Sequence, residues 1–201
     1  NQCLKSLEVA YIFFLLRQNA ELVFVSILAS PYNIVDWQKK DGKEFILYAN
    51  TMIATSDNDG KTWGIGSSKA PDDYARCLFV DDISKVLYVG TSKGLFTTDY
   101  RGITVKEYYQ HGLGNNFYIA AVAKRGNLAI AINRTDLKEG AIAFNNSNDL
   151  KNFTIHQIEG KKDWAIHSLN MMSNSLLTAK FYGPDNIVWF KGFSTIYAGS
   201  L

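Results

Sequence analysis

The chain has 201 residues, of which 47% are hydrophobic and 13% aromatic, enough to bury the core of a single domain over residues 1–201. Its formal net charge is +2, from 21 basic and 19 acidic residues, so no strong overall field would attract nucleic acid or an anionic membrane. We therefore expect no nucleic-acid partner. We also expect no cofactor, because no phosphate-binding loop or dinucleotide-binding fingerprint is present.

The most apolar part of the chain lies near its beginning, in residues 9–16 and 22–28. Polar residues that include Arg17 and Glu21 separate the two runs, and neither run approaches the roughly 20 apolar residues that span a bilayer. We expect two strands joined by a polar turn, part of a partial or closing blade over residues 1–29, and no membrane insertion. A signal peptide is the alternative, although no small-residue cleavage site directly follows the first run.

Four short apolar runs, at residues 46–49, 86–89, 128–131 and 176–179, recur at intervals of roughly 40 to 48 residues. Strand-like segments precede and follow each run, with turn residues such as Asp41-Gly42 and Arg125-Gly126 between them. The expected preceding strands are residues 33–37, 74–80, 118–123 and 165–169. The expected following strands are residues 52–56, 94–98, 141–145 and 187–191.

This spacing is typical of an all-β propeller with four-stranded blades. About four blades are recognisable, over approximately residues 30–70, 71–115, 116–160 and 161–201, and they would form either a small ring or part of a larger one. No segment has a helical period of apolar residues over the ~10 positions that a helix needs. A two-layer β-sandwich is the alternative, because it also requires strands at regular intervals.

The most specific motif lies in the first repeat, where residues 56–63 read Ser-Asp-Asn-Asp-Gly-Lys-Thr-Trp. A degenerate copy occupies residues 98–105, and a shorter copy without glycine occupies residues 147–153. In such a turn a side-chain oxygen accepts hydrogen bonds from backbone N–H groups, and the glycine adopts a conformation that a Cβ would resist. The residues expected to build these turns are Ser56, Asn58, Gly60, Thr62 and Trp63, then Thr98, Gly102 and Thr104, then Ser147 and Asp149.

Residues 56–63 resemble the Asp-box, or bacterial neuraminidase repeat, of pattern Ser-x-Asp-x-Gly-x-Thr-Trp, with Asn58 at the Asp position. The resemblance implies a propeller in which the boxes join the outer strands of each blade, away from the funnel where ligands bind. The family includes sialidases, xyloglucan-cleaving glycoside hydrolases, sortilin-type receptors and photosystem assembly factors. It therefore implies either glycan cleavage or the binding of a glycan or a protein.

Catalysis has few candidate residues. A sialidase needs an arginine triad for the substrate carboxylate, and the chain has only five arginines, several of them in expected turns and loops. A glycosidase needs two facing carboxylates, for which Asp36 and Asp163 are the candidates, with turn or surface positions as the alternative. No metal site is expected, because the histidines are dispersed and residues 57–60, which are similar to a calcium loop, lack its first and last ligands.

Binding is the leading function: a non-catalytic binding or scaffold propeller that engages a glycan or a protein partner, with a glycoside hydrolase as the alternative. Trp37, Arg76 and Trp164 are the candidate ligand-binding residues, because aromatic rings stack on sugars and peptides and a guanidinium pairs with anions. Packing between blades is the alternative role for each tryptophan.

Three N-x-Ser/Thr sequons make Asn133, Asn145 and Asn152 candidate glycosylation sites, which favours an extracellular, cell-surface or virion-surface location. Cys3 and Cys77 would pair in an exported protein or remain two thiols, and the sequence leaves both alternatives open. It also leaves the oligomeric state open.

Overall fold

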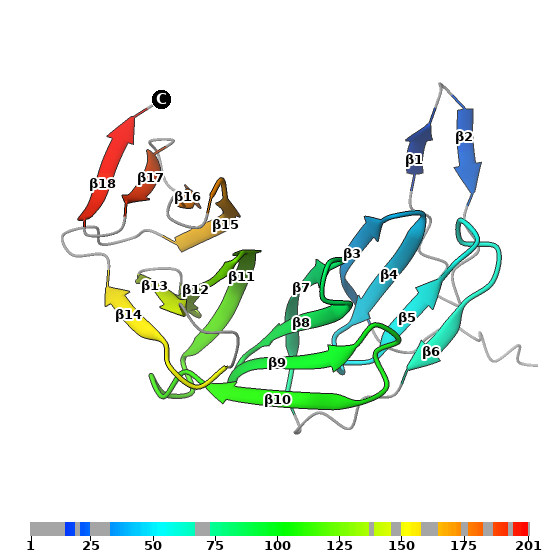
Figure 1. Cartoon of the computed structure of the whole chain (residues 1–201), viewed down its shortest axis with the longest axis horizontal. Helices are drawn as coiled ribbons and strands as arrows, with labels where there is room; N and C mark the ends of the chain where they lie inside the picture. Colours follow the sequence, from blue (N-terminus) through cyan, green and yellow to red (C-terminus); the bar gives the residue numbers. More distant parts are fainter. Residues whose placement is uncertain are drawn as a thin grey trace, which may run out of the picture.

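The computed structural model describes residues 15–18, 21–24, 33–66, 73–136, 139–145, 150–157, 165–173, 177–182, 187–192 and 195–200. Within these ranges every regular element is a β-strand. The strands form four four-stranded antiparallel sheets and one two-stranded sheet (Figure 1). This arrangement confirms the all-β fold and the four-stranded repeats expected from the sequence.

Each four-stranded sheet is a meander, in which consecutive strands pair, and we call the sheets blades 1 to 4 in chain order. Blade 1 contains β3 (Ile34–Lys40), β4 (Lys43–Tyr48), β5 (Ile53–Ser56) and β6 (Gly64–Gly66). Blade 2 contains β7 (Ala75–Asp81), β8 (Val86–Thr91), β9 (Gly94–Asp99) and β10 (Val105–Gln110). Blade 3 contains β11 (Phe117–Arg125), β12 (Asn127–Arg134), β13 (Gly140–Asn145) and β14 (Thr154–Gln157). Blade 4 contains β15 (Ala165–Met171), β16 (Leu177–Tyr182), β17 (Ile187–Gly192) and β18 (Thr195–Ser200).

The two-stranded sheet joins β1 (Leu15–Gln18) to β2 (Glu21–Phe24), so the expected pair of N-terminal strands is present. In the described part of the chain these two strands pair with each other and with no other strand. Blade 4 is complete without them, since all four of its strands come from its own repeat.

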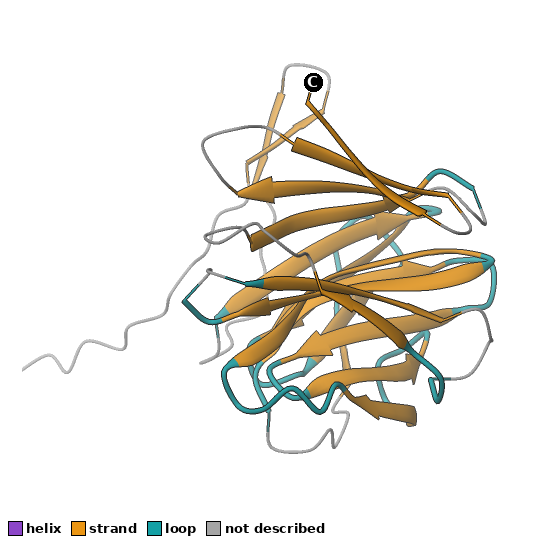
Figure 2. Ribbon diagram, turned by 90° about the vertical axis from the view of Figure 1, so that its left-hand side faces the viewer, coloured by secondary structure: helices purple, strands orange, loops and turns teal. Residues whose placement is uncertain are grey.

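The four blades follow one another around an arc, with β3, β7, β11 and β15 toward its middle and the fourth strand of each blade at its rim (Figure 1). Each of these inner strands contacts the next one. Viewed from the side, the blades stack as successive twisted layers (Figure 2). The start of each inner strand therefore lies near the start of the next, which positions the candidate site described below.

Apolar layers between the blades form the core. A middle strand such as β8 has a blade on each side, so both of its faces are apolar, and this explains the short uninterrupted runs in the sequence. Phe45 and Leu47 of blade 1 pack with Leu87 and Phe96 of blade 2. Equivalent layers join blade 2 to blade 3 and blade 3 to blade 4.

Each inner strand contains a register shift near its beginning, where it pairs with the second strand of its blade. The shifts lie between Ile34 and Asp36, Ala75 and Cys77, Ile119 and Ala121, and Ile166 and Ser168. The additional residues are Val35, Arg76, Ala120 and His167. A bulge reorients the side chain of the inserted residue, so the same position of four successive blades points away from the regular pleat.

Candidate functional site

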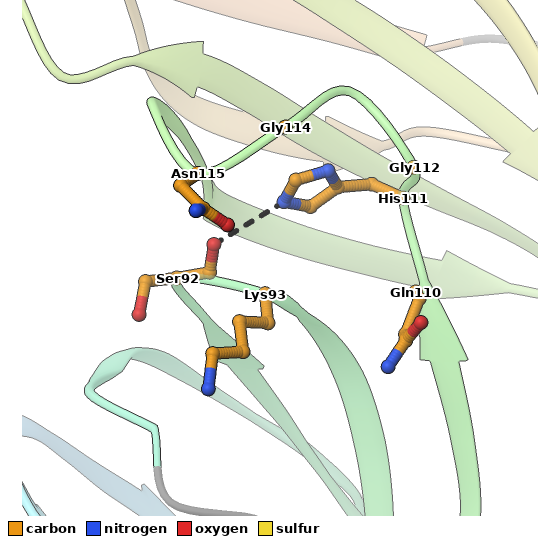
Figure 3. A pocket seen from close by; sticks show the side chains of 7 residues that line it. All are labelled: Ser92, Lys93, Gln110, His111, Gly112, Gly114 and Asn115. Atoms are coloured by element: carbon orange, nitrogen blue, oxygen red, sulfur yellow. Dashed lines mark hydrogen bonds between the residues drawn. The ribbon is translucent and has the colours of Figure 1, made fainter.

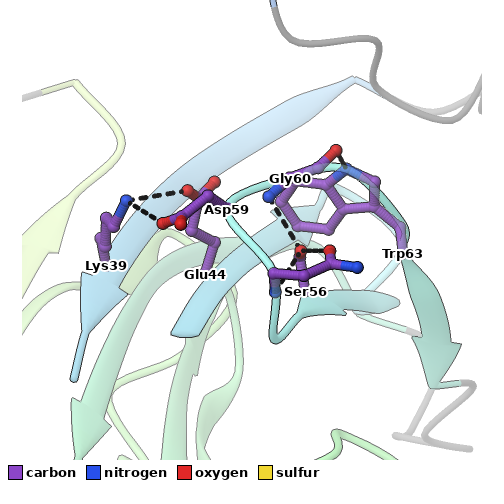
Figure 4. Close-up of polar contacts among 7 residues, drawn as sticks. Lys39, Glu44, Ser56, Asp59, Gly60 and Trp63 are labelled. Carbon is purple, nitrogen blue, oxygen red and sulfur yellow. Dashed lines mark hydrogen bonds and ion pairs between the residues drawn. The ribbon is translucent and has the colours of Figure 1, made fainter. Parts of the chain in front are cut away.

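The turn between β5 and β6 is held by the side chains of Ser56, which is labelled in Figure 4, and of Asn58. The Ser56 hydroxyl accepts hydrogen bonds from the backbone N–H groups of Gly60, at 2.9 Å, and Asn58, at 3.4 Å, and donates one to Asn58 Oδ1, at 3.0 Å. Asn58 Oδ1 also accepts from the Thr62 N–H at 2.9 Å, while its amide Nδ2 donates to Thr62 Oγ1 at 2.8 Å. An aspartate at position 58 could not donate this last bond, but it could accept one from the Thr62 hydroxyl.

Trp63 closes the same turn, because its indole Nε1 donates to the Gly60 carbonyl oxygen at 3.0 Å (Figure 4). Its half-buried ring packs with Ile46 and Ala54 on one face of blade 1. Gly60 has a φ of 75°, the left-handed conformation that the motif was expected to require. Outside the turn, Lys39 Nζ lies 2.8 Å from Asp59 Oδ1 and fixes the turn to β3.

In blade 2 the corresponding capping role belongs to Asp99. Its Oδ1 accepts hydrogen bonds from the backbone N–H groups of Arg101, at 3.1 Å, and Ile103, at 2.9 Å. Thr98, the residue expected to do this, instead donates its hydroxyl proton to the Asp99 carbonyl oxygen at 2.9 Å. Thr104 contributes its carbonyl oxygen, which accepts from the Asp99 N–H at 3.2 Å. The capping side chain therefore lies one residue later in the second turn, where the Asp99 carboxylate and not the Thr98 hydroxyl accepts the backbone bonds.

The turns between the third and fourth strands of the blades also connect neighbouring blades. Gly102, with a φ of 70°, lies so close to β5 that a Cβ placed there would be 2.7 Å from Ile53 Cβ. In blade 3, the Leu150 N–H donates to Glu107 Oε2 of β10 at 3.1 Å. Ser147 and Asp149, expected from the sequence to build a third such turn, lie outside the described residues. The turn of one blade thus packs on the outer strands of the preceding blade.

Side-chain hydrogen bonds join the blades near the inner strands. The Asp36 carboxylate of β3 accepts from the Leu78 N–H of β7 at 2.8 Å, and from the Trp37 N–H at 2.8 Å. Burial raises the pKa of Asp36, and these two N–H groups counteract part of that effect. Asp36, one of the two candidate catalytic acids, therefore occupies a blade junction. Asp163, the other, lies outside the described residues.

Blades 3 and 4 are joined by Asn133 of β12. Its Oδ1 accepts from the Ile166 N–H and its Nδ2 donates to the Ile166 carbonyl oxygen, both at 2.9 Å. Asn133 is only 1% exposed and Asn145 is fully buried, so neither side chain is open to a glycosylating enzyme in the folded chain. Asn152, the third candidate glycosylation site, is exposed.

Cys77 is a free, buried thiol between blades 2 and 3, and its Sγ lies 3.7 Å from the Ile119 carbonyl oxygen. Burial, together with the nearby Asp36 carboxylate, raises the pKa of Cys77 to about 12. The thiol is therefore protonated and unreactive at neutral pH. Cys3 lies outside the described residues.

At the far end of the inner strands, Lys124 Nζ of β11 lies 2.5 Å from Asp81 Oδ2 of β7. Burial by itself would raise the pKa of Asp81, but the hydrogen bonds from Lys124 and Ser84 outweigh it and lower that pKa below 3.8. For Lys124, burial favours the neutral form, whereas the bond to Asp81 raises its pKa above 10.5. The pair links blades 2 and 3 electrostatically.

A pocket of about 390 Å³ lies where the inner strands begin, and we call it the inner-strand pocket. All four bulge residues line it: Val35, Arg76, Ala120 and His167. The pocket thus receives one reoriented side chain from every blade. Among the described residues that line it, none is acidic.

The polar part of the inner-strand pocket is formed by Arg76 together with Tyr118 and Tyr74. The Arg76 guanidinium carbon lies 5.0 Å from the centre of the Tyr118 ring, a cation–π contact between blades 2 and 3. Tyr74 is 69% exposed at the rim of the pocket. Arg76, predicted from the sequence to bind a ligand, therefore lies in a pocket with Tyr74 and Tyr118, for which no sequence pattern indicated a binding role.

A second pocket, of about 310 Å³, lies between the β8–β9 turn and the β10–β11 loop (Figure 3). His111 spans it: Nε2 lies 3.3 Å from the Ser92 carbonyl oxygen, and Nδ1 accepts from the Leu113 N–H at 3.2 Å. The Ser92 N–H in turn donates to the Tyr74 carbonyl oxygen at 3.1 Å, so both pockets open at the same end of blade 2.

The two candidate tryptophans are not both described. Trp37 is half-buried and packs with Ile46 and Tyr48 inside blade 1, so it belongs to the core rather than to either pocket. Trp164 lies outside the described residues. Tyr109 packs against Phe153 of blade 3, with ring centres 4.3 Å apart, which makes it an interblade contact.

Within the described ranges no group of three or more histidine, cysteine, aspartate or glutamate side chains is arranged to hold a metal ion. The same ranges contain no helix of the length and apolarity needed to span a bilayer.

No family model and no curated protein matches the chain. Similar solved structures are the Dos1 propeller (12% identity, TM-score 0.56) and the Pan2 WD40 domain of Neurospora crassa (11% identity, TM-score 0.54). They are matched over 78% and 84% of this chain but over only 44% and 50% of their own lengths. A third is YCF48 bound to D1 peptide (10% identity, TM-score 0.51), matched over 90% of this chain and 67% of that one.

The chain therefore spans about half the length of the first two structures that it resembles. At these identities the likeness concerns the fold alone. Together with the four radially arranged, four-stranded meanders, it shows that this chain has the β-propeller fold.

Proposed function

We propose that the chain is a non-catalytic binding or scaffold propeller that holds a protein partner at the inner-strand pocket. The observation that carries the proposal is the convergence of four bulge residues, one from each blade, on a single pocket of about 390 Å³. A rigid scaffold that presents irregular backbone and aromatic side chains at one end is a common arrangement for a binding site.

A protein or peptide ligand suits the pocket better than catalysis does. Asp36 accepts hydrogen bonds from two backbone N–H groups at a blade junction and is not among the residues that line the pocket. Tyr74 and Tyr118 supply the amphipathic aromatic surface that is enriched at protein interfaces. One structure with the same fold, YCF48, was solved with a peptide bound, which supports a peptide ligand for this chain.

We also infer that the turns at residues 56–63 and 98–105 are Asp-boxes. The support is their shared construction: a side-chain oxygen caps two backbone N–H groups in each turn, and a glycine with positive φ follows. In this proposal the boxes have a structural role and the inner-strand pocket has the binding role.

Photo-crosslinking at two positions of blade 2 tests the proposed site. Tyr74 precedes β7 and is 69% exposed, whereas Ile83 follows β7 at its other end and is 92% exposed. A benzophenone amino acid at position 74 should capture a defined partner in the native cell, while the same group at position 83 should not.

The captured protein is then purified and its affinity measured for Tyr74→Ser and Ile83→Ser. We expect binding to weaken for Tyr74→Ser and to stay unchanged for Ile83→Ser. Capture at position 83 alone, or equal affinities for both variants, would show that the inner-strand pocket is not the binding site.

A further inference from the structure

We propose that the inner-strand pocket recognises a carboxylate, supplied by an acidic peptide segment of the partner, and that Arg76 and Tyr118 bind it. This inference rests on the proposed function and specifies the chemistry of the ligand. Three observations support it: the contacts of Arg76, the position of the Tyr118 ring, and the lack of an acidic side chain among the described residues that line the pocket.

Arg76 differs from the other arginines whose side chains are described. Arg134 forms ion pairs with Asp136 and Glu139, both at 2.7 Å, and Arg125 donates to the Met172 carbonyl oxygen at 2.6 Å. In the described part of the chain, the contact of Arg76 is the Tyr118 ring. Its N–H donors therefore remain available to a ligand.

The Tyr118 ring is a fixed support for the guanidinium. Tyr118 lies on β11 and pairs with Asn133 of β12, whose amide is held at both ends by Ile166. A guanidinium stacked on an aromatic ring keeps its edge free, and that edge carries the donors that match the two oxygens of a carboxylate. Tyr118 itself lines the pocket, and a tyrosine hydroxyl can also donate to a carboxylate.

Among the described residues that line the pocket, no carboxylate competes for this position. The nearest acid in sequence, Asp73, already accepts hydrogen bonds from Thr91 and Ser92 hydroxyls and from the Lys93 N–H. The described side chains that line the pocket include two tyrosines, asparagines and aliphatic residues but no aspartate or glutamate. Arg76 therefore attracts an anionic ligand, and none of these described side chains repels it.

Matched peptides test the charge requirement on the full chain. Acetyl-Ala-Ala-Phe with a free C-terminal carboxylate is compared with its C-terminal amide, and acetyl-Ala-Glu-Phe-amide is compared with the Gln peptide. Binding is followed by NMR titration of the arginine Nε–H and tyrosine ring signals. We expect at least one carboxylate peptide to bind about tenfold or more tightly than its neutral match, as for a hydrogen-bonded ion pair. If only the first pair differs in affinity, the pocket binds a C-terminal carboxylate. If only the second pair differs, it binds a glutamate side chain.

Variants assign the effect to Arg76. Arg76→Gln should abolish the difference between charged and neutral peptides, and Arg76→Lys should retain only part of it, because an ammonium does not bind a carboxylate in the bidentate manner. Arg101→Gln, which removes the same charge from a 72% exposed side chain, should retain all of it. Melting temperatures verify that each variant is folded.

Equal affinity for charged and neutral peptides in the wild-type chain would overturn the carboxylate assignment, whatever the stability of the variants. Retention of the full difference in Arg76→Gln would overturn the role of Arg76. A partner captured at position 74 whose binding ignores the carboxylate would refute this inference while leaving the proposed function standing. Failure to capture a partner there would refute the proposed function itself.

Discussion

Gly66 of β6 lies directly against Gly102 in the box turn of the next blade. A Cβ on Gly66 would be 2.6 Å from the Gly102 carbonyl oxygen and 2.4 Å from that of Arg101. Because real Cβ atoms do not approach so closely, two backbones from different blades meet here with no room for a side chain. The box turn therefore acts between blades as well as within its own.

Gly102→Ala tests this interblade contact, and Gly112→Ala is its matched control. The two glycines have φ values of 70° and 69°, but a Cβ at Gly102 would meet Ile53 at 2.7 Å, whereas Gly112 has nothing within 4 Å. We expect Gly112→Ala to lower the free energy of unfolding by about 1–2 kcal/mol, the cost of positive φ. Gly102→Ala should cost roughly 1–3 kcal/mol more, because overpacking is added.

Urea denaturation of both variants measures the difference. Equal losses would show that Gly102 is required for its backbone conformation alone and that the two blades are not in close contact there.

Ser56→Ala tests the capping of the first box. The change removes the acceptor for the Gly60 and Asn58 N–H groups, and Gly60 is buried. We expect the free energy of unfolding to fall by about 1–3 kcal/mol, the cost of leaving a buried donor unsatisfied. Ser168→Ala, a half-buried serine of β15, is the control and should cost less than about 0.5 kcal/mol. A Ser56→Ala chain as stable as this control would mean that the box turn does not depend on its serine.

Asp81→Asn tests the pH dependence that Asp81 and Lys124 impose. Because the pKa of Asp81 is lowered in the folded chain, its contribution to stability is present above its ordinary pKa of 3.8 and is lost as the pH falls through its folded pKa. The pKa of Lys124 is raised, so its contribution is present below 10.5 and is lost as the pH rises through its folded pKa.

We therefore expect Asp81→Asn to lower the free energy of unfolding near pH 7 by about 2 kcal/mol. At acid pH the difference in free energy of unfolding between the variant and the wild type should disappear. Asp82→Asn makes the same charge change one residue further on and should leave the profile unchanged. Chemical denaturation at a series of pH values measures this, and a constant gap at every pH would contradict the pairing.

Asn133→Ala tests the junction between blades 3 and 4. It would leave the buried N–H and carbonyl groups of Ile166 unpaired, so we expect a loss of roughly 2–5 kcal/mol in the free energy of unfolding. Asn133→Asp should also be destabilising, because its carboxylate would face the Ile166 carbonyl oxygen. Asn152→Ala, at an exposed position, should have no effect beyond about 0.5 kcal/mol. Unchanged melting of both Asn133 variants would show that this junction does not hold the blades together.

The sequence predicted the fold because the fold depends on local patterns. The run at residues 86–89 lies within β8, whose two faces are buried between blades, so four consecutive apolar residues identify it without any knowledge of its neighbours. The box at residues 56–63 is equally local, since its hydrogen bonds connect residues at most four positions apart. Such features can be recognised in the chain itself.

The candidate site could be predicted only in part, because it depends on how separate sheets pack. The sequence points to Arg76, but its partner Tyr118 lies on another blade, and the bulge that directs Arg76 into the pocket leaves no simple pattern in the sequence. Trp37 is a predicted ligand-binding residue, yet its ring packs within blade 1. Asp36 is a predicted acid, and its hydrogen-bond partner Leu78 is 42 positions away.

The location of the binding site is the central claim, and a hydrogen-exchange footprint tests it most directly. The amides of the full chain are compared with and without the partner captured through position 74. We predict slowed exchange at the beginnings of β7 and β11, around Arg76 and Tyr118, with no change in the turn at residues 82–85. Slowed exchange confined to that turn, or to the outer strands β10 and β14, would contradict the account.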